Sequence, residues 1–591
     1  MDVAKELDQE VRSYLDGSAG EQSWNIQWQK TRKDFKGEMT LVTFPLTKAL
    51  KKSPEQIGED IGQHLKESSD IVADYNVVKG FLNLELSHAF WVARLKDMHD
   101  QERYGMAEPD SKDLLMVEYS SPNTNKPLHL GHLRNNFLGW SVSEILKAHG
   151  HPVKKVQIIN DRGIHICKSM YSWSVSEDKL TPESSGIKGD LLVGKYYVDF
   201  DKKYKAELAS LVEEGMSEEE AKKQAPSMLA VRELLRQWEE KDPETRALWN
   251  RMNEWVYTGW KATYDRMGVS FDKNYYESET YLLGRKVVLE GVEKGIFSQD
   301  PDGSIWVDLT DEGLDRKILQ RSDGTTVYMT QDIGTAIMRF EENPGLAAQI
   351  YTVGNEQEYH FKVLFLILDK LGYSWAKNCH HLSYGMVELP QGKMKTREGT
   401  VVDADDLMEE MVETARATTE ELGKLDGIDE DESQDLFESI GLGALKYFLL
   451  KVDPRKRMMF NPEESIDFTG NTAPFIQYTH ARIKSILRRY KGQAAVETGH
   501  PLHEKERDII VVLNGYPSII EEAAEQYSPA LIANYIYDLV KTFNHYYQSV
   551  PILSDDDAPS VVQTRIAILE TVARVISSGM RLLGVRVPEQ M

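Results

Sequence analysis

Residues 113–161 read DLLMVEYSSPNTNKPLHLGHLRNNFLGWSVSEILKAHGHPVKKVQIIND. The apolar run 113–121 is typical of a buried strand, and the turn PNTNKP separates it from a stretch, 129–150, that has helical periodicity and ends at Gly150. A second strand-like run follows at 154–161. This strand–helix–strand order predicts a parallel sheet, with a ligand site outside the carboxyl end of the first strand.

The sequence on either side predicts further domains. A chain of 591 residues has room for several domains at roughly 100–200 residues each. Near the N-terminus a helical run begins at the cap Ser53, with Gln56 at the capping-box position, and GFLNLEL at 80–86 is strand-like. The three predicted domains are 1–112, a small α+β domain; 113–435, an α/β domain; and 436–591, an all-α domain.

Two features subdivide the α/β domain. Residues from about 172 to 265 are rich in Lys, Glu and Trp, which predicts a helical insertion. Strand-like runs resume at 347–355 and 380–389, with a helical run at 358–372 between them. The stretch KLDGIDEDESQD at 424–435 predicts an acidic linker before the all-α domain.

Composition excludes several classes of protein. The net charge of -25 argues against non-specific coating of nucleic acid, although it leaves room for a local basic surface. The two cysteines, Cys167 and Cys379, lie far apart, which excludes a disulfide scaffold and a cysteine-based zinc site. The N-terminus has no apolar leader segment, and no apolar run is long enough to span a membrane. We therefore expect a cytoplasmic protein with reduced thiols and no membrane partner.

The tetrapeptide His129-Leu130-Gly131-His132 carries the first chemical signal. It lies at the predicted start of a helix, where unpaired N–H groups and a partial positive charge favour phosphate. Imidazoles three residues apart share a helix face and can add hydrogen bonds to phosphate oxygens. Gly131 leaves space for a planar ring to approach. Strand, turn and helix in this order favour a nucleotide site over a chance pair of histidines.

A basic loop, GKMKTREG at 392–399, carries the second signal. Its Lys393, Lys395 and Arg397 could stabilise the charge of a triphosphate and its leaving pyrophosphate. By itself such a loop is more often simply solvated. A third candidate, GDLLVGKY at 189–196, almost matches a phosphate-binding P-loop, but Tyr196 stands where that motif needs a short hydroxyl and no clear strand precedes it.

Together the two signals resemble the signature pair of class I aminoacyl-tRNA synthetases. VEYSSPNTNKPLHLGHLRNN at 117–136 further resembles the signature of the arginyl-tRNA synthetases. Four more stretches resemble blocks of that family in the same order: RSDGTTVYMTQDIGTA at 321–336, YTVGNEQEYHF at 351–361, SYGMV at 383–387 and FIQYTHARIKSI at 475–486. The resemblance extends from the N-terminal domain to Met591.

The family resemblance implies a Rossmann-like catalytic domain at 113–435, a D-loop-binding N-terminal domain and an anticodon-binding C-terminal domain. It implies that arginine is activated with ATP and Mg²⁺ to arginyl-adenylate and pyrophosphate, with tRNA bound first. Arginine is then transferred to the 2′-OH of the terminal adenosine of tRNA(Arg). The implied catalytic residues are His129, His132, Lys126, Lys393 and Lys395. The implied adenine site consists of Gly131, Gly385, Met386 and Val387. For arginine, the resemblance implies that Glu118, Tyr328 and Asp332 face the guanidinium and that Asn123 and Gln357 hold the amino and carboxylate end.

Carboxylates at a guanidinium site also follow from chemistry, since the five N–H donors of arginine match carboxylate oxygens.

Two departures from the family pattern are visible. The loop KMKTR lacks a clear match to the second lysine of the usual motif, and Lys126 is thought to compensate. The block Asn160–Gly163 is followed by His165 where the family usually has Gln.

A basic region predicts where the tRNA backbone binds. Residues 446–491 contain ten Lys or Arg and four Asp or Glu, a local reversal of the sign of the charge. The aromatic stretch YIYDLVKTFNHYYQS at 535–549 resembles the family's anticodon-binding region, where bases are read by stacking. The implied tRNA contacts are Tyr547 and Met591 in the C-terminal domain and Phe81 and Asn83 in the N-terminal domain.

Three alternatives remain open at this point. Another nucleotidylyltransferase with the same histidine motif would share the phosphate chemistry but would not need the basic helical domain. A non-enzymatic RNA-binding relative would not need both histidines and Asp332. A glutamyl or glutaminyl synthetase would be poorly served by acidic residues at 118 and 332. We expect the chain to be a monomer.

Overall fold

The structure is a computed structural model that describes residues 3–32, 34–388, 402–421, 430–497 and 501–591. It divides into two compact units, which are described separately. The first unit comprises 1–104, 482–517 and 538–576, and the second comprises 105–481, 518–537 and 577–591.

The N-terminal part of the first unit is a four-stranded antiparallel sheet flanked by helices, as the sequence predicted. The strand order is β1-β2-β4-β3. Ser53 and Gln56 form the predicted capping box at the start of α3. The elements are α1 (Val3–Ala19), β1 (Trp28–Lys30), β2 (Met39–Val42), α2 (Thr47–Leu50), α3 (Pro54–Ser68), β3 (Val72–Val78), β4 (Phe81–Leu86) and α4 (His88–Asp100).

A five-stranded parallel sheet forms the centre of the second unit. Its strands lie in the order β12-β11-β5-β6-β7 and pair in parallel throughout. The chain runs from β5 outward to β7 and then returns to β11 on the other side of β5. The direction therefore reverses between β5 and β11, where ligands of such sheets bind outside the carboxyl ends. The strands are β5 (Leu114–Glu118), β6 (Val153–Ile159), β7 (Lys273–Tyr276), β11 (Leu346–Gly354) and β12 (His380–Tyr384).

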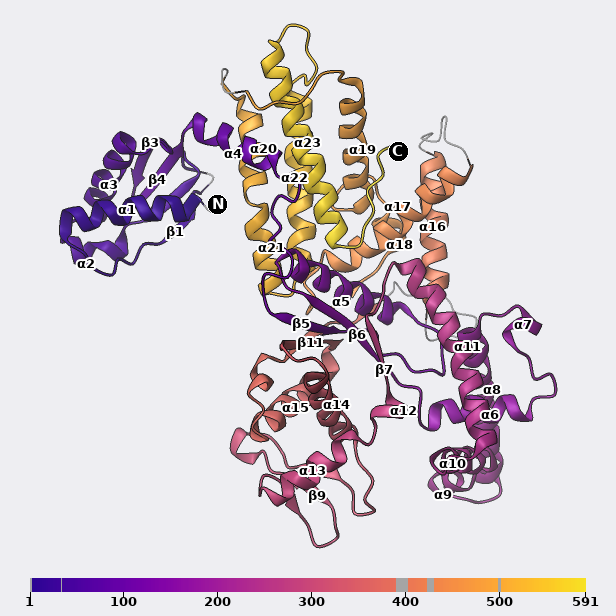
Figure 1. Cartoon of the computed structure of the whole chain (residues 1–591). Helices are drawn as coiled ribbons and strands as arrows, with labels where there is room; N and C mark the ends of the chain where they lie inside the picture. Colours follow the sequence, from indigo (N-terminus) through magenta and orange to yellow (C-terminus); the bar gives the residue numbers. More distant parts are fainter. Residues whose placement is uncertain (1–2, 33, 389–401, 422–429, 498–500) are drawn as a thin grey trace. The chain divides into compact units, whose positions relative to one another are not determined.

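Helices cover both faces of this sheet (Figure 1). On one face lies α5 (Leu130–Ala148), and on the other lie α14 (Tyr328–Glu342) and α15 (Glu358–Lys370). Met116 of β5 is buried in a cluster with Met338 and Phe340 of α14. A Cβ at Gly139 of α5 would lie 2.4 Å from the Tyr119 side chain, so a glycine is what lets α5 pack this closely beside β5.

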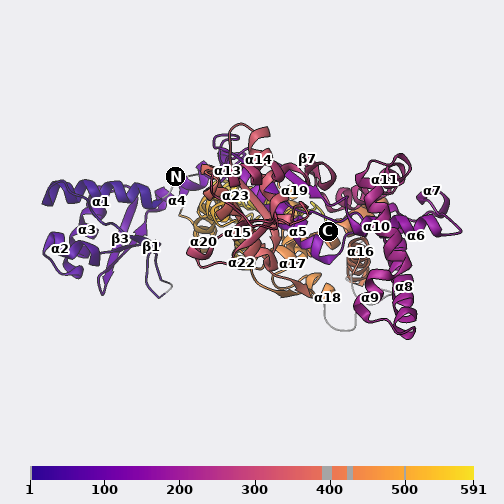
Figure 2. The ribbon, with the colours of Figure 1, turned by 90° about the horizontal axis from the view of Figure 1, so that it is seen from below.

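The predicted insertion is helical, and its helices pack together (Figure 2). The stretch GDLLVGKY opens the long helix α8 instead of forming a loop, in agreement with its rejection as a P-loop. The helices are α6 (Ile164–Val175), α7 (Pro182–Ser185), α8 (Gly189–Glu213), α9 (Glu218–Gln224), α10 (Pro226–Glu239) and α11 (Pro243–Met267).

Two features differ from the sequence predictions. A three-stranded sheet of β8 (Ser298–Gln299), β9 (Ile305–Val307) and β10 (Lys317–Gln320) was not predicted, because its strands are too short for a pattern. The predicted linker 424–435 is wrong from residue 430, where α17 (Glu430–Leu450) begins. Its acidic first turn suits the positive end of the helix dipole. The predicted domain boundary at 435/436 therefore lies inside a helix.

The rest of the described chain completes the two units. The remaining elements of the α/β part are α12 (Glu277–Thr280), α13 (Leu283–Glu293), β13 (Val387–Glu388), which pairs with β14 (Met458–Met459), and α16 (Ala404–Glu421). The C-terminal helices are α18 (Pro462–Ser465), α19 (Ala473–Arg489), α20 (Glu504–Asn514), α21 (Tyr516–Glu525), α22 (Pro529–Ser549) and α23 (Pro559–Leu582). No helix in the described part of the chain is long and apolar enough to cross a membrane.

Candidate active site

The chain is strained where it leaves β5. Ser120 and Ser121 have φ angles of 79° and 47°, a left-handed conformation that non-glycine residues rarely adopt. Asn135 of α5 stabilises this bend: its Oδ1 accepts from the Ser120 N–H, and its Nδ2 donates to the Thr352 carbonyl at 2.7 Å. Backbone strain supported in this way is common at ligand sites.

The two histidines of the motif form the first turn of α5. His129 is the N-cap, and its Nδ1 accepts from the Gly131 N–H at 3.2 Å. Nδ1 of His132 in turn accepts from the His129 N–H at 3.1 Å. Because both Nδ1 atoms accept, each neutral ring carries its proton on Nε2. Each imidazole therefore keeps one N–H donor for a ligand.

Burial keeps both rings neutral. It lowers the pKa of His129 to about 4, with the nearby charge of Lys126 acting in the same direction. Burial also lowers the pKa of His132 well below its usual value, and His129 and Lys126 add to the effect. The Lys126 ammonium is itself half-buried, which lowers its pKa. One cation and two neutral donors thus lie together at a helix N-terminus, a composition suited to phosphate.

Gly131 has the His129 imidazole as a close neighbour. A Cβ there would lie 3.1 Å from Cε1 of His129. The missing Cβ at 131 therefore leaves room for the His129 imidazole on this side of the helix start.

Two of the predicted arginine-binding residues lie on one face of α14. Tyr328 is its first residue, and Asp332 follows one turn later. The Tyr328 side chain is 74% exposed. Asp332 Oδ2 lies 2.6 Å from Nε2 of His360, whose ring orients the carboxylate. A phenol and a carboxylate at this spacing can contact the same ligand.

Glu118 has a protein partner instead of an open site. It is buried at the end of β5 and forms an ion pair with Arg339 of α14. The Arg339 side chain is only 1% exposed. A buried guanidinium needs this carboxylate, so Arg339 already holds Glu118 in the structure, with the Glu118 side chain 8% exposed. The sequence could not reveal this, because the two residues meet only when β5 and α14 pack.

Glu277 was missed by the sequence prediction. It follows β7 directly, at the carboxyl edge of the sheet. Burial raises its pKa to about 7, the Arg162 charge opposes this shift, and the carboxylates of Asp161 and Asp332 add to it. An acidic group kept partly protonated beside Asp332 is a candidate partner for a ligand cation. No strand was predicted at 273–276, so the place of Glu277 at a strand end became visible only in the fold.

The two residues predicted to hold the other end of arginine follow strands β5 and β11. Asn123 is exposed and pairs through its backbone with Asn160 after β6. Gln357 is exposed at the end of the short 3-10 turn after β11. Both side chains lie beyond carboxyl ends of the parallel sheet and are open to a ligand.

The stretch predicted to bind adenine, 385–387, is tied to the rest of the protein through its backbone. The Gly385 N–H donates to the Pro454 carbonyl at 2.9 Å, and the Gly385 carbonyl accepts from Arg134 at 2.6 Å. A Cβ at Gly385 would lie 2.6 Å from the Lys456 carbonyl oxygen, so this glycine serves packing. Met386 is 48% exposed and leads into Val387 of β13, which leaves apolar side chains as the surface for a base.

The predicted tRNA residues differ in exposure. Phe81 is half-buried and packs edge-on against Phe44. Asn83 is buried, with its amide bonded to Thr40 and Asn76, so its role is to hold the N-terminal sheet together. Tyr547 is 38% exposed and stacks on Phe543. Met591 is half-buried. The predicted loop residues Lys393, Lys395 and Arg397 lie outside the described residues.

Comparisons with known proteins agree with this geometry. Three family models match: "Arginyl tRNA synthetase N terminal domain" over 2–86, "tRNA synthetases class I (R), catalytic domain" over 95–461, and "DALR anticodon binding domain" over 476–591. The arginine–tRNA ligase of Flavobacterium psychrophilum is 56% identical over 577 residues, which is 96% of each chain. The chain belongs to the arginyl-tRNA synthetases.

Further relatives agree with this assignment. The arginine–tRNA ligase of Bacteroides thetaiotaomicron is also 56% identical over 96% of each chain. The solved arginyl-tRNA synthetase of Thermus thermophilus shares the fold, with a TM-score of 0.77 and 23% identity over the whole of both chains. The match to the catalytic-domain model covers residues 95–461, which include the residues described above at the carboxyl ends of β5, β7 and β11. The match ends at 461, beyond the boundary predicted at 435.

Proposed function

We propose that this synthetase, which as a member of its family charges tRNA with arginine, forms arginyl-adenylate at the carboxyl edge of its parallel sheet. The proposal rests on the two imidazoles that lie together at the N-terminus of α5. The Asp332 carboxylate of α14 is the acidic partner for arginine. The reaction needs no protein nucleophile. The arginine carboxylate attacks the α-phosphorus of ATP, an oxygen–phosphorus bond forms, and pyrophosphate leaves with the electron pair of the broken bond.

Phosphate binding comes from two neutral donors and from lysine cations. The Nε2–H groups of His129 and His132 point away from the cap hydrogen bonds that occupy their Nδ1 atoms. With Lys126 they stabilise the charge that develops on the phosphates, and Lys393 and Lys395 add to it. Gly131, Gly385, Met386 and Val387 provide the nucleotide-binding surface, with the exposed Met386 side chain against the adenine.

Arginine binding uses a different pair of carboxylates from the pair that the sequence implied. The guanidinium lies against Asp332 and Tyr328, and Glu277 takes the place that the sequence prediction assigned to Glu118. The acidic edge attracts the cationic end, and Asn123 and Gln357 bind the amino and carboxylate end. Glu118 acts indirectly, since it neutralises Arg339 beneath the site.

The tRNA, which the family resemblance implies is bound before activation, accepts the activated amino acid. We place the backbone of tRNA(Arg) on the basic region 446–491, with Tyr547 and Met591 as candidate anticodon contacts and Phe81 as the candidate D-loop contact. Transfer to the 2′-OH of the terminal adenosine releases AMP. Among the described residues no three His, Cys, Asp or Glu side chains form a metal-binding group, so we propose that Mg²⁺ enters on the ATP phosphates. The cytoplasmic location and the monomeric state stay predictions.

The direct test is ATP–pyrophosphate exchange with each of the twenty amino acids and with citrulline, with and without tRNA(Arg). We expect exchange with arginine and not with lysine or citrulline, because a polar pocket rejects a mismatched ligand by about 10⁴-fold or more. The family resemblance predicts that exchange requires tRNA. Exchange driven by glutamate or glutamine, or by no amino acid, would overturn the proposal.

Glu277 predicts a pH dependence of arginine binding. Its pKa of about 7 in the free enzyme means that its carboxyl is largely protonated at pH 6 and ionised at pH 8. The guanidinium favours the ionised form, so KM for arginine should rise as pH falls below 7, by up to about tenfold per pH unit. In Glu277→Gln this dependence should be absent. An unchanged pH profile in that variant would remove Glu277 from the arginine site.

A further inference from the structure

The backbone around His129 is held by a distant segment, residues 402–404. The Leu130 N–H donates to the Val402 carbonyl at 3.1 Å, and the Ala404 N–H donates to the Leu128 carbonyl at 3.0 Å. His129 and Asp403 are partners in an antiparallel bridge. Any shift of this segment therefore moves the N-cap histidine.

Segment 402–404 in turn leads directly into α16. Asp403 Oδ1 accepts from the N–H groups of Asp405 at 2.8 Å and Asp406 at 3.3 Å. This is the N-cap arrangement, which fixes the residue before a helix to its first turn. The position of His129 thus depends on the position of the first turn of α16.

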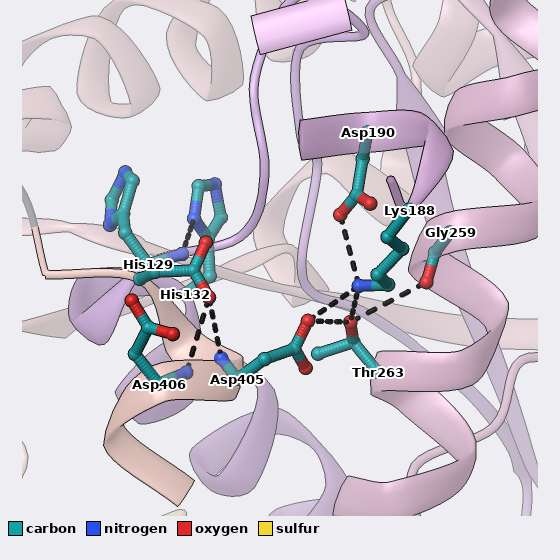
Figure 3. Close-up of polar contacts among 9 residues, drawn as sticks. His129, His132, Lys188, Asp190, Gly259, Thr263, Asp405 and Asp406 are labelled. Carbon is teal, nitrogen blue, oxygen red and sulfur yellow. Dashed lines mark hydrogen bonds and ion pairs between the residues drawn. The ribbon is translucent and has the colours of Figure 1, made fainter. Parts of the chain in front are cut away.

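Lys188, just before α8 in the helical insertion, anchors that turn. Its Nζ donates to Asp405 Oδ2 at 2.6 Å, to Asp190 Oδ2 at 3.1 Å and to Thr263 Oγ1 at 2.5 Å. Figure 3 shows the ammonium between these three side chains. Thr263 of α11 also donates to Asp405 at 3.2 Å. The Asp190 side chain is fully buried, so removal of the lysine charge leaves two carboxylates without a cation between them.

The α8 helix is held rigidly against its neighbours. It crosses α11 so closely that a Cβ at Gly259 would lie 2.3 Å from Asp190 Oδ1. Further along α8, a Cβ at Gly194 would lie 3.0 Å from Pro127 Cδ and 3.6 Å from Lys126 Cα. The same helix therefore contacts the turn that carries Lys126 and, through Lys188, the segment that holds His129.

We propose that Lys188 is a positioning residue for adenylate formation: through Asp405 it sets His129 relative to Lys126. The inference rests on the proposed phosphate roles of these two residues. The inference gives a function to the start of α8, where the sequence GDLLVGKY almost matches a P-loop. Lys188 contacts no substrate in this scheme, and its effect passes through Asp405, Asp403 and the bridge to His129.

The test is a double-mutant cycle of Lys188→Met and Asp405→Asn in the full chain, with ATP–pyrophosphate exchange as the assay. Each single change should lower kcat/KM for ATP by about 10–100-fold, since a misplacement of about 1 Å at a reacting centre can cost 10²-fold. KM for arginine should stay within threefold. The double variant should be no slower than the slower single variant, because both changes remove the same link.

A neighbouring ion pair between α11 and α16 provides the matched control. Arg266 Nη2 lies 2.8 Å from Glu409, one turn further along α16 than Asp405. Arg266→Met should lower Tm and leave the ATP parameters within threefold. If Arg266→Met impairs exchange as much as Lys188→Met does, the role of Lys188 is only structural. Additive effects in the cycle, or unchanged ATP kinetics in Asp405→Asn, overturn the inference. Arginine-dependent exchange by the unmodified chain tests the underlying function independently.

Discussion

Replacement of His129 by alanine is expected to lower arginine-dependent ATP–pyrophosphate exchange by about 10²–10³-fold, the usual cost of losing one preorganised donor to a developing charge. His132→Ala should have an effect of similar size. Because Nδ1 of each ring is occupied by a cap hydrogen bond, the loss at the site is an Nε2–H donor. Single-turnover formation of arginyl-adenylate is the measurement that separates this loss from product release.

The chain contains its own control for loss of the helix cap. His503 is the N-cap of α20, and its Nδ1 accepts from the Lys505 N–H at 3.1 Å, as Nδ1 of His129 does from Gly131. His503→Ala should therefore lower stability by about the same 0.5–2 kcal/mol as the cap at His129 without slowing exchange. If both alanine variants lose activity equally, or if His129→Ala stays fully active, the phosphate role of His129 is wrong.

Asp332→Asn should reduce kcat/KM for arginine by about 10²–10⁴-fold. A carboxylate that binds a guanidinium through two hydrogen bonds contributes about 1.5–3 kcal/mol for each of them, and 1.36 kcal/mol corresponds to a factor of ten. Asparagine has the same shape but no charge and one oxygen fewer. KM for ATP should change by less than threefold, since Asp332 belongs to α14 and the proposed phosphate donors belong to the first turn of α5.

Glu342→Gln is the matched control for Asp332. Glu342 is the last residue of the same helix, and its carboxylate pairs with Lys273 at 2.6 Å at the partly exposed surface. Exposed ion pairs contribute little, about 0–1 kcal/mol, so this variant should keep its arginine kinetics. An arginine KM within threefold of the unmodified enzyme in Asp332→Asn would show that the specificity for arginine comes from elsewhere.

Local signals in the sequence were sufficient for much of the fold. The strand–helix–strand unit around His129 and the capping box at Ser53 depend on periodicity and turn chemistry within a few residues, and the structure confirms them. The resemblance to the arginyl-tRNA synthetases is confirmed by the comparisons. The linker at 424–435 was misread because acidic residues favour both a solvated loop and the first turn of a helix.

What the tertiary structure decided is which charges meet. Glu118 and Asp332 are both acidic residues that the sequence predicted at the guanidinium site. Glu118 is neutralised by the buried Arg339, whereas Asp332 is partly exposed beside His360. Glu277 and Lys188 gain their proposed roles only because β7 ends near Asp332 and the residue before α8 reaches the first turn of α16. Periodicity is a property of neighbouring residues, so it shows that a helix begins at His129. The strength of a charge depends on burial and on partners hundreds of residues away, which only the packed chain brings together.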